Sequence, residues 1–209
     1  HPGFSEEKLA KLGGKPYHEP TFSLERGSRP LTARPLVVGM GPAGLFAALL
    51  MAENGYRPVI IDRGDNVENR KKSYERFVRL GILDTESNIQ FGAGGAGTFS
   101  DGKLVTRVND SMSTYVLKRF VEFGAPSEIL YLAKPHIGTD VLSVVVDNMI
   151  SRIVELGGQI MYHTKFIDYK TSGAKITGIV TNRGDIDCSA LVLAIVKVFP
   201  LRLNLNVRL

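Results

Sequence analysis

Apolar residues gather in short runs that are separated by glycine-rich or polar segments. Leu36 to Val38 predicts one strand, and Pro58 to Asp62 predicts a second, buried one. Between them, Ala43 to Asn54 has an amphipathic helical pattern and stops at Gly55, a residue type that commonly terminates helices. The pattern therefore predicts a strand–helix–strand unit over residues 35–63.

Helical patterns continue after this unit. Asp65 to Leu80 is partly helical, and Tyr115 to Phe123 predicts a helix that ends at Gly124. A longer helix is expected from about Val141 to Leu156, with Thr139 or Asp140 as its cap.

The last part of the chain has the alternation and turn residues of β-structure. Turns at 171–173 and 182–184 divide a three-stranded meander. An all-apolar run then follows, which we expect to return to a parallel sheet. The predicted strands are Gln159–His163, Thr164–Tyr169, Lys175–Thr181, Asp185–Cys188 and Ala190–Ile195.

Three glycines mark the junction of the first strand and its helix, at Gly39, Gly41 and Gly44. In dinucleotide-binding folds the first allows a tight turn, the second lets the backbone approach a pyrophosphate, and the third allows close helix–strand packing. Pro42 suits the first helical turn, where amides face the phosphates. Asp62 follows the third glycine by 18 positions, close to the spacing of a carboxylate that accepts hydrogen bonds from the adenosine ribose. A nucleotide site is therefore predicted.

A second glycine-rich loop runs from Phe91 to Leu104, with glycines at 92, 94, 95, 97 and 102. Such density exposes backbone amides, and successive N–H groups can form a concave anion site. Thr98, Ser100 and Asp101 add short hydrogen-bonding groups. The loop's residues alone are equally compatible with a flexible surface segment.

Charge and composition exclude several other classes. The chain has 209 residues and a net charge of +5, but its basic residues are spread along it without a sustained block. Arg70-Lys71-Lys72, followed by Glu75, predicts a solvated helix face, so no nucleic-acid partner is expected. No apolar run approaches the roughly 20 residues that span a bilayer, and the N-terminus lacks a secretory signal. We therefore expect a cytoplasmic protein without a membrane partner.

Cysteine chemistry is also limited. Cys188 is the only cysteine, which excludes an internal disulfide and a cysteine-cluster metal site, and no metal site is predicted. Its place in a predicted strand favours a core side chain over a nucleophile.

Several segments resemble a bacterial family of FAD-dependent dehydrogenases, also called NAD(FAD)-utilising dehydrogenases. The resemblance to this family is carried by the run Gly-Gly-Ala-Gly-Thr-Phe-Ser-Asp-Gly-Lys-Leu from Gly94 to Leu104 and by Leu130 to Asp140. Two further segments, Gly41 to Leu45 and Asp62-Arg63-Gly64, resemble the FAD fingerprints of the wider flavoprotein form of the dinucleotide-binding fold. It covers about residues 36–195. It implies an α/β fold of the FAD-type, Rossmann-like kind, with a parallel sheet and a three-stranded meander crossover.

Composition and the extent of the resemblance together predict a domain plan. Residues 1–34 would be a peripheral lead-in, 35–195 the FAD-binding domain with a glycine-rich excursion at about 65–138, and 196–209 a tail that departs from the family pattern. The tail suggests a truncated or frame-shifted end, so the flavin site of this chain would be incomplete.

FAD is the implied cofactor, with NAD(P)H as a candidate electron donor and a small molecule of unidentified class as substrate. The glycine turn would hold the pyrophosphate, the second loop would lie along the flavin, and a backbone contact near Lys165 would meet the adenine. His136, Thr139 and Asp140 would sit at a helix start near the flavin or substrate, although His136 by itself is typical of a loop or capping histidine, and no catalytic residue is predicted. The predicted cofactor-binding residues are Gly39, Gly41, Pro42, Ala43, Gly44, Asp62, Arg63, Gly94, Gly95, Ala96, Gly97, Thr98, Lys165 and Phe166.

Two other functions remain open at this point. The glycine turn and Asp62 would also suit an NAD-dependent dehydrogenase, which the meander argues against. The tail after Ile195 would suit a truncated, catalytically silent nucleotide-binding module.

Overall fold

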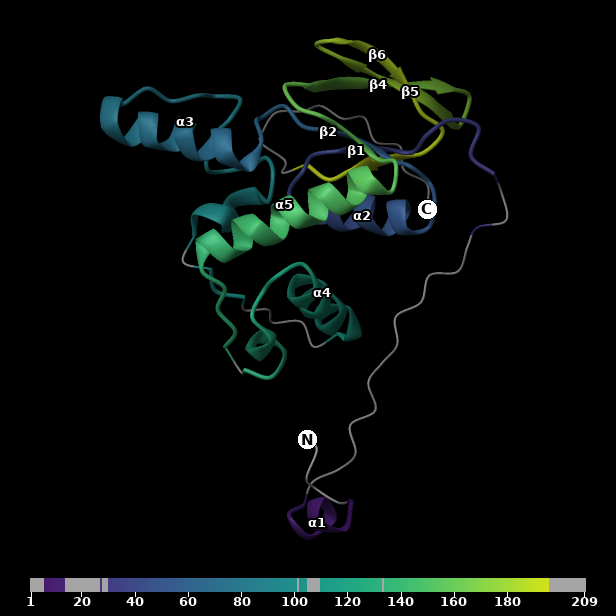
Figure 1. The fold of residues 1–209 in the computed structure, drawn as a ribbon. Helices are drawn as coiled ribbons and strands as arrows, with labels where there is room; N and C mark the ends of the chain where they lie inside the picture. The colour runs from purple at the N-terminus through teal and green to yellow at the C-terminus, as the bar shows by residue number, and fades with distance from the viewer. Residues whose placement is uncertain are drawn as a thin grey trace.

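The computed structural model describes residues 6–13, 27, 30–100, 102–104, 110–132 and 134–195 (Figure 1). Most of the lead-in 1–34, Asp101 and the tail 196–209 lie outside the described residues. The domain plan inferred from the sequence therefore stays a prediction.

The centre of the fold is a four-stranded parallel sheet in the order β3-β2-β1-β7. Its strands are β1 (Leu36–Val38), β2 (Val59–Ile61), β3 (Gln159–Met161) and β7 (Leu191–Leu193). The last of these pairs in parallel with β1, as predicted for the returning apolar run. The α/β fold class with a parallel sheet is thereby confirmed.

A three-stranded antiparallel meander precedes the returning strand. It consists of β4 (Phe166–Ser172), β5 (Lys175–Thr181) and β6 (Gly184–Asp187). Because Thr171 and Ser172 extend β4, the first turn is shorter than predicted and falls at Gly173. The meander crossover itself is confirmed.

The described helices after residue 35 follow the predicted pattern with differences at their starts, and a short helix lies in the lead-in, where no element was predicted. They are α1 (Glu6–Lys11), α2 (Pro42–Glu53), α3 (Val67–Leu80), α4 (Ser111–Glu122) and α5 (Thr139–Glu155), with short 3₁₀ helices η1 (Gly95–Phe99) and η2 (Ser127–Leu130). None of those in the described ranges has the length and apolar character that crossing a bilayer requires.

Capping explains the differences at the helix starts. α4 begins at Ser111, four residues earlier than predicted, because the Asp110 carboxylate accepts a hydrogen bond from the Met112 amide at 2.8 Å. α5 begins at Thr139 with Gly138 as its N-cap and without a side-chain cap, so neither predicted capping residue acts as one.

Both faces of the two central strands, β1 and β2, are buried, and successive strand residues face opposite layers. Val37 and Ile60 belong to the apolar cluster that includes α2 and α5, whereas Val38 and Ile61 belong to the cluster that includes the meander. Figure 1 shows the meander on one side of the sheet and α2 and α5 on the other. The sheet is thus the middle of three layers, and its strand ends are fixed from both sides.

The buried Cys188 thiol gives a test of the meander layer. Cys188 directly follows β6 and is 1% exposed, and burial together with the neighbouring Asp187 raises the pKa of its thiol. We expect Ellman's reagent at pH 8 to label the native chain more than about 100-fold more slowly than the chain in 8 M urea. A Cys188→Ser chain is the blank. Equal native and unfolded rates would show that the meander does not cover this thiol.

Candidate functional site

The glycine turn after β1 separates two packing glycines from one that faces open space. A Cβ at Gly44 would lie 1.8 Å from the Gly39 carbonyl oxygen, and a Cβ at Gly39, where φ is +100°, would lie 2.5 Å from the carbonyl oxygen of Ala194. Around Gly41 no atom lies within 4 Å of a Cβ position. Gly44 therefore lets the helix approach the end of β1, Gly39 lets the chain pass close to the residue after β7, and Gly41 leaves the backbone open to a ligand.

The N-terminus of α2 lies at this open glycine. Gly41 is the N-cap in extended conformation, and Pro42 occupies the first helical turn. The amides of Ala43 and Gly44 belong to the first turn, where N–H groups have no acceptor within the helix. Pro42 and Ala43 are exposed. Together with the helix dipole, this arrangement suits an anion such as a pyrophosphate.

Asp62 ties the glycine turn to the end of β2. Its side chain is 5% exposed, and Oδ2 accepts a hydrogen bond from the Met40 amide while Oδ1 accepts one from the Gly64 amide, both at 2.8 Å. A carboxylate oxygen can accept two hydrogen bonds, so each retains capacity for a hydroxyl donor. Asp62 thus has a structural role that the sequence motif does not include.

The second glycine-rich loop packs directly on the first. The Gly94 amide donates to the Met40 carbonyl at 2.9 Å, and a Cβ at Gly95 would lie 2.8 Å from Cδ of Pro42. On its other side the loop meets α5, since a Cβ at Gly94 would lie 2.9 Å from the Val146 side chain. The loop therefore follows a fixed path between the glycine turn and α5, with Ala96 exposed and Thr98 buried.

Arg70 binds the backbone of this loop. The predicted solvated helix face over residues 70–72 is therefore wrong for Arg70. Its side chain on α3 is completely buried rather than part of a solvated face, whereas Lys72 remains exposed and pairs with Glu68. All five guanidinium N–H groups have acceptors. These are the carbonyl oxygens of Asn88, Ala93 and Gly95 and the hydroxyl oxygen of Thr98.

The spacing of α3 contained a signal for this burial. Val67, Arg70 and Tyr74 lie at positions i, i+3 and i+7, so they share one face of the helix. Val67 is buried, Arg70 lies 4.9 Å from the centre of the Phe99 ring, and Tyr74 meets the same ring edge-on at 5.5 Å between centroids. The run of three basic residues concealed this periodicity.

Arg63 and Lys165 meet at a shared carboxylate. Glu86 pairs with Arg63 Nε at 2.9 Å and with Lys165 Nζ at 3.0 Å, and the Arg63 guanidinium lies 4.2 Å from the centre of the Phe91 ring. The Thr164 amide donates to the Asp62 carbonyl at 2.9 Å, which places Lys165 next to the end of β2.

The backbone of Lys165 already forms hydrogen bonds within the protein. Its amide donates to Asn182 Oδ1 at 2.7 Å, and its carbonyl accepts from the Asn182 amide at 3.2 Å. Any backbone contact to an adenine would therefore use the second lone pair of that carbonyl. Phe166 is half-buried and begins β4, where it pairs with Thr181.

The two segments that carry the family resemblance lie side by side. The Leu104 amide donates to Pro135 O at 2.9 Å, and the Ile137 amide donates to Gly102 O at 2.8 Å. A Cβ at Gly102 would lie only 1.6 Å from the Ile137 carbonyl oxygen, so this contact requires glycine. His136 is exposed and sits just before α5, at the helix start where it was predicted.

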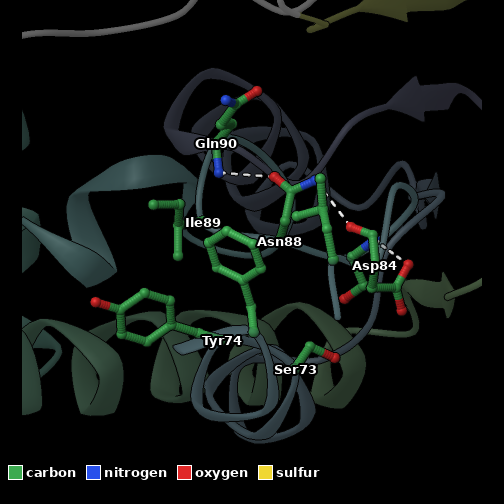
Figure 2. A pocket seen from close by; sticks show the side chains of 9 residues that line it. Ser73, Tyr74, Asp84, Asn88, Ile89 and Gln90 are labelled. Atoms are coloured by element: carbon green, nitrogen blue, oxygen red, sulfur yellow. Dashed lines mark hydrogen bonds between the residues drawn. The ribbon is translucent and has the colours of Figure 1, made fainter. Parts of the chain in front are cut away.

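A separate hollow of about 200 Å³ lies between α3 and residues 83–90 (Figure 2). Tyr74 and Ile89 line it, and hydrogen bonds join Asn88 to Gln90 and to Asp84 behind it. Its lining includes no residue of the glycine turn and no predicted cofactor-binding residue. The hollow is therefore not the predicted cofactor site.

The sequence and the structure were compared with those of known proteins. No family model matches the chain. An uncharacterised protein of Clostridium beijerinckii is 47% identical over 173 residues, which is 83% of this chain and 32% of that protein. The chain therefore spans about a third of the length of this relative.

Solved structures of oxidoreductases show a distant similarity. Glycine oxidase from Bacillus cereus is 14% identical with a TM-score of 0.42, covering 78% of this chain and 55% of its own. L-proline dehydrogenase from P. horikoshii is 16% identical with a TM-score of 0.42, covering 79% and 53%. Ferredoxin reductase from Rhodopseudomonas palustris is 14% identical with a TM-score of 0.38, covering 78% and 24%.

The glycine turn predicts a contrast between two similar substitutions. Gly44→Ala would force a methyl group against the Gly39 carbonyl and should lower the free energy of unfolding by about 3 kcal/mol or more. Gly41→Ala meets open space and should change it by less than about 1 kcal/mol. Urea unfolding followed by circular dichroism measures both, and equal effects would contradict the close strand–helix contact.

Proposed function

We propose that this chain binds FAD at the end of the parallel sheet, as the cofactor-binding part of a flavin-dependent oxidoreductase. The observation that supports this most strongly is the open backbone at Gly41, at the start of α2. Asp62 is hydrogen-bonded to the adjacent Met40 amide, and the second glycine-rich loop packs against the same turn. These residues fit a ligand that has both a pyrophosphate and a ribose.

Each part of the cofactor would have its own contacts. The amides of Ala43 and Gly44 would bind the pyrophosphate beside Gly41. The free lone pairs of Asp62 would accept hydrogen bonds from the adenosine ribose. The Lys165 carbonyl would meet the adenine, and the loop from Gly94 to Thr98 would lie along the flavin side.

FAD is favoured over NAD because the second loop extends the site beyond the pyrophosphate. Gly94 and Gly95 contact Met40 and Pro42, so the exposed backbone after them continues the surface that begins at α2. When bound, flavin would supply the redox chemistry, while these residues bind and orient it. A small-molecule substrate and NAD(P)H as electron donor are part of this proposal, as is the activity of the full-length protein.

Cofactor binding is measured by titrating the purified chain, stripped of nucleotides, with FAD and following flavin fluorescence. We expect saturable binding that ADP reverses, because ADP carries the pyrophosphate and adenosine. FMN lacks the adenosine and one phosphate, and loss of those contacts should cost about 3 kcal/mol, or about 100-fold in affinity. Preference for NAD over FAD by the folded chain would replace this proposal with the NAD-dependent alternative.

A substitution at the open glycine tests the proposed position of the pyrophosphate. Gly41→Val adds a branched side chain where the ligand backbone would lie, so FAD affinity should fall at least about 100-fold. Gly27→Val is the matched control, since a Cβ there also meets no atom within 4 Å, its φ is not positive, and the residue precedes the strand–helix–strand unit in the sequence. Similar FAD affinities for the two variants would contradict a site at Gly41.

A further inference from the structure

We propose that Arg70 is a positioning residue, which turns the amides of the second glycine-rich loop toward the bound dinucleotide without touching it. This inference rests on the proposed FAD site and assigns a role to a side chain that the glycine motif does not include. Three features support it: the acceptors that Arg70 binds, the direction of the peptide units that carry them, and the burial of its charge.

The acceptors come almost entirely from the loop and its approach. Nη2 donates to Gly95 O at 3.2 Å and to Asn88 O at 3.0 Å, and Nη1 donates to Ala93 O. Nη1 also reaches Thr98 Oγ1 at 3.4 Å. One guanidinium group thus fixes backbone over residues 88–98, a segment whose glycines would otherwise allow many conformations.

The geometry of the peptide bond determines where the neighbouring loop amides point when Arg70 binds these carbonyls. In a trans peptide the carbonyl and the N–H of the next residue point in opposite directions. Because Arg70 binds the carbonyls of Ala93 and Gly95, the amides of Gly94 and Ala96 point away from it. The Gly94 amide reaches the Met40 carbonyl and fastens the loop to the glycine turn. The Ala96 amide also points away from Arg70, and its residue is exposed.

The positive charge of Arg70 also favours binding of an anion at the loop. Among the described residues Arg70 forms no ion pair, and its hydrogen-bond acceptors are all neutral oxygens, so a positive charge lies behind the loop. Burial lowers its pKa to about 10, which Asp62 partly opposes, so the group stays charged at neutral pH. A carbonyl bound to a cation makes the amide of the same peptide a better donor, and a buried cation favours an anion on the outer side.

Variants of Arg70 separate this role from general support of the fold. Arg70→Met removes the five donors and the charge, and Arg70→Lys keeps the charge but loses the planar arrangement of donors. Arg76→Met is the control, since Arg76 lies on the same helix and is exposed. Hydrogen exchange measured by mass spectrometry and FAD titration are carried out on all four chains, the parent included.

We expect Arg70→Met to lose amide protection in peptides that cover residues 92–99 while β1, α2 and α5 keep theirs. FAD affinity should fall 10- to 100-fold, the range typical for residues that orient a ligand's direct contacts. Arg70→Lys should be intermediate in both measurements, and Arg76→Met should match the parent chain. FAD-saturated Arg70→Met should also show a more negative flavin midpoint potential, because a nearby positive charge stabilises reduced, anionic flavin.

Other results would overturn the inference. A folded Arg70→Met chain with FAD affinity within twofold of the parent would exclude a positioning role, and so would loss of protection spread evenly over the molecule. If Arg70→Met does not fold, Arg70→Lys decides the question by the same two measurements. If the parent chain binds no FAD, the proposed function fails, and the exchange data alone decide whether Arg70 orders the loop.

Discussion

The contact between β1 and the first turn of α2 is the constraint on which the rest of the structure depends. Strand and helix lie so close that a Cβ on Gly44 would overlap the carbonyl oxygen of Gly39. Only glycine permits this distance, and the distance sets where α2 begins relative to the sheet. The Met40 backbone then lies where its amide reaches Asp62 and its carbonyl reaches Gly94. This close approach between β1 and α2 thus fixes Met40 beside the open glycine, Gly41, and through Met40 it fixes Asp62 and Gly94.

Two layers of packing keep this junction rigid. Beneath the sheet, α2 is covered by α5 and α4, and the rings of Phe46 on α2 and Phe120 on α4 pack at a tilt with 5.7 Å between their centroids. Above it, the meander buries Val38 and Ile61. Because both faces are closed, the strand ends cannot tilt, and the polar groups beyond them keep their relative positions.

The sequence predicted the core of the fold because its signals are local. Apolar runs, the glycine turn and Gly55 define the strand–helix–strand unit, and the run before Ile195 defines the returning strand. Burial of Arg70 could not be predicted as readily, because it depends on carbonyls 18 to 25 residues away that turn inward only in the folded chain. For the same reason the sequence could not show that the backbone amide of Lys165 already donates a hydrogen bond to the side chain of Asn182.

The parallel strands are only three residues long, and this has a consequence for precision. Each strand has a single register in which its apolar side chains match both layers, because a shift by one residue would exchange the two faces. Such a shift would also move Gly39, Asp62 and Ala194 by about 3.3 Å relative to one another, more than the length of a hydrogen bond. The apolar side chains of the core therefore set the strand register, and the register sets the relative positions of the polar groups at the strand ends. The choice of valine, leucine and isoleucine within the sheet thus determines the geometry of the proposed binding site.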